Sequence, residues 1–66
     1  MGNEGAVVFM KVEIHLYTQS RPDIYTDVES IYQEGSLYCM ITPDGIQKYP
    51  LIHIIRIKES YPDGYP

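Results

Sequence analysis

Apolar and polar residues alternate along residues 8–17. The even positions are all apolar, and from residue 10 onward lysine, glutamate, histidine and tyrosine fill the odd ones; the even set is Val8, Met10, Val12, Ile14 and Leu16. A period of two is the pattern of a strand that buries one face and exposes the other. These residues therefore predict a half-buried first strand.

A second run, "IYTDVESIYQ", covers residues 24–33. Ile24, Thr26 and Val28 share one strand face, and the apolar phase then shifts to Ile31, which predicts a bulge near residues 29–30. A short helix from Asp27 is the alternative, because residues 28, 31 and 32 also have helical spacing. Tyrosine and β-branched residues dominate the run and favour the strand. The sequence leaves residues 27–33 open between the two.

Two turn signals bound the next strands. Glu34-Gly35 predicts a tight turn, and "TPDG" at residues 42–45 predicts a second one with Gly45 at positive φ. Between them the alternation of residues 37–41 predicts a third strand, whose buried face would hold Leu37, Cys39 and Ile41. Residues 46–49 are expected to return antiparallel to it.

Pro50 interrupts the last aliphatic stretch, residues 51–57. Proline has no N–H and does not fit the middle of a sheet ladder. Ile52 and Ile54 have one parity, whereas Ile55 and Ile57 have the other, so one continuous strand would expose one pair. We expect a one-turn helical corner near residues 50–53, followed by a final strand.

The chain is thus expected to be all-β, a small antiparallel five-stranded sheet or a partly open barrel. Residues 8–59 would form the single domain, with a flexible N-terminus at residues 1–7 and a flexible tail at residues 60–66. Five strands, with a tight hairpin between the third and the fourth and a one-turn break before the fifth, resemble the Src-homology-3-like small barrel in topology. The chain has no tryptophan and no "ALYDY" run, so the resemblance implies no proline-binding groove. The pattern is also similar in style to short β-rich proteins of phages and mobile elements.

Charge narrows the partner class. The 66 residues carry a net charge of -4, and residues 22–47 contain acidic residues but neither lysine nor arginine. Nucleic-acid binding rests on cations that neutralise phosphates, so this balance disfavours it. A protein partner with a basic surface is the better electrostatic match. The apolar run at residues 6–10 is too short to span a membrane, and the single cysteine fits a cytoplasmic location.

Seven tyrosines stand out in the composition. Tyr17, Tyr25 and Tyr38 have the parity opposite to the expected core, and Asp27 and Glu29 lie near them in the chain. Tyrosine gives a large contact area at low entropic cost and is enriched at interfaces. These five residues are therefore the predicted partner-binding face. Cross-strand tyrosine pairs that only stabilise the outer face are the alternative.

The sequence contains few residues or motifs that could support catalysis. Cys39 has the parity of the expected core, where a thiol is an inert small hydrophobe, and the chain lacks phosphate-loop and nucleophile-elbow motifs. His15, His53 and Cys39 are too few for a tetrahedral zinc site unless acidic residues join them. The sequence thus predicts no enzyme, cofactor or metal, but a protein-interaction module, such as a regulator or inhibitor. Its alternatives are a homo-oligomer assembled through sheet edges and a barrel that stacks single-stranded nucleic acid on tyrosines.

Overall fold

The computed structural model describes residues 9–61, which form six strands and one short 3-10 helix. In chain order these are β1 (Met10–Leu16), β2 (Asp23–Val28), β3 (Ser30–Glu34), β4 (Leu37–Thr42), β5 (Gly45–Pro50), η1 (Leu51–His53) and β6 (Ile54–Ser60). No helix within residues 9–61 has the length and apolar character needed to cross a bilayer. Residues 1–7 and 62–66, in the predicted flexible ends, lie outside the described residues.

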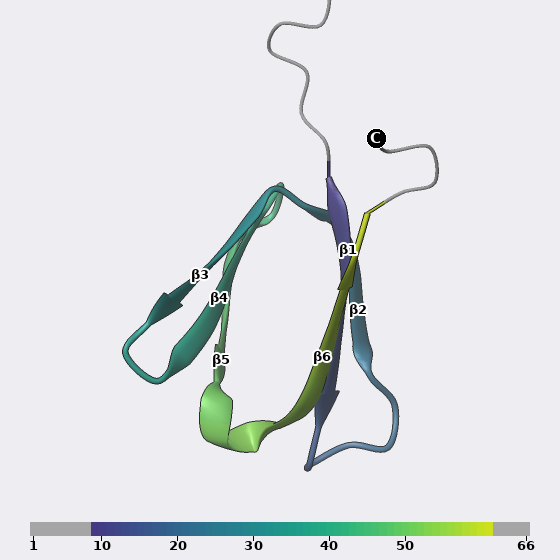
Figure 1. Cartoon of the computed structure of the whole chain (residues 1–66), viewed down its shortest axis with the longest axis vertical. Coiled ribbons are helices and arrows are strands. Elements are labelled where there is room, and N and C mark those ends of the chain that lie inside the picture. Colours follow the sequence, from purple (N-terminus) through teal and green to yellow (C-terminus); the bar gives the residue numbers. More distant parts are fainter. Residues whose placement is uncertain (1–8, 62–66) are drawn as a thin grey trace, which may run out of the picture.

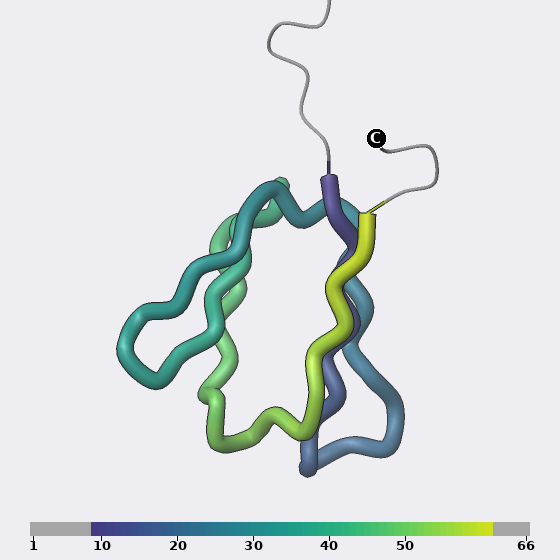
Figure 2. The backbone as a smooth tube through the Cα atoms, in the orientation of Figure 1, coloured from purple at the N-terminus to yellow at the C-terminus, as the bar shows by residue number. Residues whose placement is uncertain are grey.

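The strands form two antiparallel sheets of three strands each. The first has the order β2-β1-β6 and the second the order β3-β4-β5. Figure 1 shows the sheets facing each other, joined at one end by the link between β2 and β3 and at the other by η1. The tube in Figure 2 follows the chain from the first sheet into the second and back again. The all-β antiparallel class is confirmed, but there are six strands instead of five and the sheets do not close into a barrel.

The core lies between the two sheets. Its buried residues come from the central strands β1 and β4 and from the end of β2, and they are Val12, Ile14, Leu16, Val28, Tyr38 and Met40. Partly buried side chains of β2, β3, β5, η1 and β6 pack around them. The alternation predicted for β1 is confirmed, because its even positions from 12 to 16 are buried. Removal of this apolar area from water is the main stabilising contribution to the fold.

The chain leaves the first sheet at Glu29. Val28 pairs with Met10 in the first sheet, whereas Ser30 pairs with Ile41 in the second. The Glu29 N–H donates to the Ile41 carbonyl oxygen at 2.8 Å, which holds the crossing point. The phase shift expected as a bulge within one strand therefore marks the change of sheet, and the alternative helix at residues 27–33 is wrong. This change of sheet adds the sixth strand.

In two strands, β4 and β2, the side that faces the core is not the side that the sequence predicted. In β4, Tyr38 and Met40 are buried in the core, and the side of the strand that carries Cys39 faces away from it. In β2, Tyr25 packs against the core while the Ile24 side chain is 52% exposed. An irregularity in the pairing of β1 with β2 allows Tyr25 and Val28, three residues apart, to point the same way.

The predicted turns and corner are confirmed. Gly35 has φ 59° and Gly45 has φ 124°, a region in which a side chain would be strained. η1 forms the corner, and the Leu51 N–H donates to the Ser36 carbonyl oxygen at 2.9 Å. The pairing of β1 with β6 also contains a register shift. It allows Ile54 and Ile57, which have opposite parity, both to pack against the core.

The core predicts a strong contrast between two isoleucines. Ile14 is fully buried between the sheets, whereas Ile55 is 55% exposed. We expect Ile14→Ala to lower the free energy of unfolding by about 2–5 kcal/mol, because it removes transfer energy and leaves a cavity. The control Ile55→Ala should change it by about 0.5 kcal/mol or less. Urea denaturation checks both, and equal losses would contradict the assignment of the core.

Candidate functional site

A hollow opens at the end of the molecule where β2 meets the turn between β4 and β5. Its volume is ≈ 280 Å³, and its lining consists of Ile24, Tyr25, Thr26, Asp27, Thr42, Pro43 and Asp44. β2 contributes one wall and the "TPDG" turn the other, so the two parts are far apart in sequence. Turn formation places Asp44 there, because proline and aspartate suit the two central turn positions. The sheet crossing at residue 29 brings this turn beside the end of β2.

The lining combines negative charge with apolar surface. Asp27 and Asp44 are exposed carboxylates, and no lysine, arginine or histidine is among the lining residues. Ile24 and Pro43 supply exposed apolar surface beside them. Such a surface suits a cationic group on an apolar stem, because the stem contacts apolar atoms while the charge stays near carboxylates.

Tyr25 is fixed by a hydroxyl network between the sheets. The Tyr49 hydroxyl of β5 donates to Asp23 Oδ2 at 2.8 Å, and the Tyr25 and Tyr49 hydroxyl oxygens lie 2.6 Å apart. Since the single proton of Tyr49 goes to Asp23, Tyr25 donates to Tyr49. The two rings meet edge to face at 81°, with centroids 6.3 Å apart. The network therefore links edge strand β2 of one sheet to edge strand β5 of the other.

A second hydroxyl contact joins the sheets through β6. The Tyr38 hydroxyl donates to Glu59 Oε2 at 2.8 Å. Burial raises the pKa of Tyr38, and the hydrogen bond to Glu59 raises it further. Burial likewise raises the pKa of Tyr49, with added effects of its hydrogen bonds to Tyr25 and Asp23. Both phenols therefore stay protonated at pH values well above the ordinary pKa of tyrosine.

The predicted partner-binding residues do not form one face. Asp27 and Tyr25 line the hollow. Glu29 is exposed in the link between β2 and β3 and is not part of the lining. Tyr17 is 71% exposed but follows the far end of β1, beside the corner, where its N–H donates to the His53 carbonyl oxygen. The expectation that Tyr38 faces outward is wrong, because the ring is buried in the core and the hydroxyl is bound to Glu59.

Asp44, Asp23 and Tyr49 are not among the five residues predicted for the partner-binding face. Asp44 reads only as a turn residue until the turn is placed beside β2. Asp23 and Tyr49 lie 26 positions apart, and their contact depends on how the two sheets face each other. A tyrosine in every predicted strand but the last was the available signal, since a buried phenol needs a hydrogen-bond partner.

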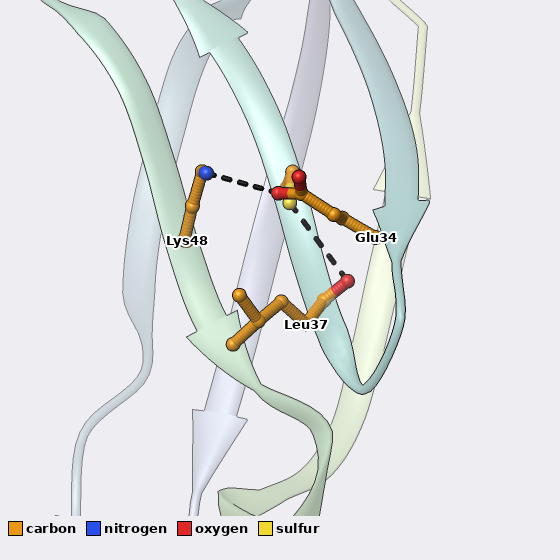
Figure 3. A network of polar contacts seen from close by, with 4 residues as sticks. Glu34, Leu37 and Lys48 are labelled. Carbon is orange, nitrogen blue, oxygen red and sulfur yellow. Dashed lines mark hydrogen bonds and ion pairs between the residues drawn. The ribbon is translucent and has the colours of Figure 1, made fainter.

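Cys39 is fully buried on the outer side of the second sheet. Tyr32 and Lys48 flank it on the neighbouring strands, and its sulfur lies 3.8 Å from the Leu37 carbonyl oxygen. Figure 3 shows Lys48 and Glu34 reaching toward each other across β4, with Nζ and Oε1 2.9 Å apart. The hydrogen bond to Glu34 raises the pKa of Lys48. Within residues 9–61, no hydrogen bond joins Cys39 to a histidine.

The histidines are also separate from the hollow. His15 lies on the outer side of the first sheet, with Nε2 3.9 Å from Glu13 Oε1, and His53 belongs to η1. Among residues 9–61, no three side chains of histidine, cysteine, aspartate or glutamate lie close enough together to hold a metal ion. The acidic hollow is therefore the arrangement on which a functional proposal can be built.

Comparison of the chain with models of protein families, with curated proteins and with solved structures gives no match.

The buried phenols predict a loss of stability at alkaline pH. The ordinary tyrosine pKa is 10.0, and the folded-state pKa values of Tyr38 and Tyr49 are higher. Above pH 10 the folded state therefore holds more protons than the unfolded state, and the free energy of unfolding falls as pH rises. The limiting slope is about 1.4 kcal/mol per pH unit for each tyrosine.

Tyr49→Phe should make this alkaline slope shallower, as measured by urea denaturation at several pH values above 10. Tyr17→Phe, at an exposed position, is the control and should keep the slope of the parent chain. A slope unchanged in Tyr49→Phe would contradict the buried hydroxyl network.

Proposed function

We propose that this protein is a non-enzymatic interaction module that binds a basic side chain of a partner protein in the acidic hollow. The observation that carries the proposal is the lining itself, in which Asp27 and Asp44 lie beside Ile24, Tyr25 and Pro43 with no cation among the lining residues. A lysine or arginine that enters would place its methylene stem on the apolar atoms and its charge near the carboxylates.

Support also comes from the charge distribution. Glu29 lies next to the hollow in the chain and is exposed, so three acidic residues belong to this end of the molecule. A local negative field raises the rate at which a basic surface encounters the hollow and disfavours acidic partners. A protein that covers a basic surface of its partner in this way would act as a regulator or inhibitor.

Two of the five lysine and arginine side chains count against the nucleic-acid alternative, because each is paired with a carboxylate. Lys58 is directly opposite Glu13 on the outer side of the first sheet, with Nζ 3.7 Å from Oε1. Lys48 belongs to the other sheet and is paired with Glu34. Stacking of single strands requires a continuous cationic groove beside the aromatic rings. These lysines lie on different sheets, each beside a carboxylate.

The first test uses N-acetyl-arginine amide as a probe of the hollow. In a titration followed by nuclear magnetic resonance, we expect the backbone amide signals of Thr26, Asp27 and Asp44 to shift while those of β6 stay in place. The shifts should be lost in the double variant Asp27→Asn/Asp44→Asn. Glu29→Gln is the matched control, because it removes a neighbouring charge outside the lining and should keep the shifts. Shifts that persist in the double variant would rule out the hollow.

The second test addresses the partner. Affinity capture from a cell lysate, quantified by mass spectrometry, should enrich a protein that binds the parent chain and Glu29→Gln but not Asp27→Asn/Asp44→Asn. Binding of that protein should weaken as salt increases, since exposed charges are screened. Equal capture by all three chains, or binding indifferent to salt, would contradict the proposal.

A further inference from the structure

The two open sheets leave four edge strands, and these differ in how well they are protected. Edge strands expose unpaired backbone N–H and C=O groups, and charges or proline normally keep other strands away. β2 carries Asp23 and Asp27, β5 carries Lys48 and ends at Pro50, and β6 contains three charged residues. β3 has one charged residue, at its last position, and no proline.

The single charge on β3 is neutralised within the chain. Glu34 is the last residue of β3, and its carboxylate lies 2.9 Å from Lys48 Nζ. The other residues of the strand are Ser30, Ile31, Tyr32 and Gln33, all uncharged, and Ser30, Tyr32 and Gln33 are exposed. The free edge of β3 is therefore a short strand that a second strand can approach without opposing charge.

We propose that β3 pairs antiparallel with β3 of a second copy of the chain, about a two-fold axis at Tyr32. The second sheets of the two copies would then join into one six-stranded sheet, with β4 flanking β3 in each copy. In an antiparallel pair, alternate residues direct their backbone groups to opposite sides, so β3 has such groups pointing away from β4. The second copy would satisfy them.

The sequence of β3 is self-complementary in this register. Ile31 lies opposite the partner's Gln33, Ser30 opposite the partner's Glu34, and Glu29 opposite the partner's Gly35. No acidic residue faces another, although the chain has a net charge of -4. A two-fold axis needs one surface that matches itself, and this register meets that condition. A second copy can therefore pair with β3 without placing like charges opposite each other.

The inference goes beyond the proposed function and does not depend on it. β3 contributes no residue to the acidic hollow. Dimer formation can therefore fail while the hollow binds a basic side chain, and the reverse also holds. Measurements of mass report only on the dimer.

The test is sedimentation velocity over a wide range of protein concentration. We expect the parent chain to pass from monomer to dimer as concentration rises. Tyr32→Lys should raise the Kd of the dimer by about tenfold or more, since it places two like charges directly opposite each other. Thr26→Lys makes the same charge change on edge strand β2 and should leave Kd nearly unchanged. A strictly monomeric chain, or an equal effect of the two variants, overturns the proposal.

A matched pair at Ser30 tests the register and does not depend on the folding of Tyr32→Lys. Ser30 is exposed, so either substitution should be accommodated, and circular dichroism checks the fold. Ser30→Lys should lower Kd because the new charge lies opposite the partner's Glu34, whereas Ser30→Glu should raise it. The reverse order, or no difference between the two, overturns the proposed pairing.

Discussion

Burial of β1 against β4 is the contact on which the rest of the molecule depends. Each sheet has only three strands, and Val12, Ile14, Tyr38 and Met40 fill the space between their central strands. A small sheet without an apolar face packed against another element is marginally stable. The lone Cys39 excludes a disulfide within the chain, so this packing has no covalent support. The link at Glu29 and the corner at η1 matter because they set one sheet opposite the other.

The small size of this core explains the use of tyrosine. Tyr25, Tyr38 and Tyr49 provide large rings that extend the apolar contact, and each has a hydroxyl that needs a partner. Glu59 accepts from Tyr38 and Asp23 accepts from Tyr49, each from the opposite sheet, and Tyr49 accepts from Tyr25. A buried hydroxyl left unpaired is costly, so these contacts also fix how the sheets are aligned. The tyrosines with these contacts therefore have a structural role. The residues that can bind a partner are mainly other ones.

Local signals in the sequence predict the two turns, the corner and every strand except the division of residues 24–33 into two, because each of these depends on residues close together in the chain. The inward face of β4 was beyond such reasoning, since Leu37, Cys39 and Ile41 on one parity are as apolar as Tyr38 and Met40 on the other. In the structure Tyr38 and Met40 point into the core, and the hydroxyl of Tyr38 has Glu59 as its partner across the core. Asp27 could be predicted as a site residue from the cation-free middle of the chain. Asp44 could not, because its place beside β2 follows from the change of sheet at residue 29.

The two proposed surfaces lie on different parts of the fold and differ in chemistry. The hollow uses the carboxylates of Asp27 and Asp44, whereas the edge of β3 is open because it lacks charge. A two-fold dimer would present two hollows at a fixed separation. Partners with two basic sites at that spacing would then be bound more tightly than either hollow alone allows, because the second contact is intramolecular. A partner with one basic site would gain nothing from the dimer, so the two surfaces together would select partners by the number and spacing of their basic sites.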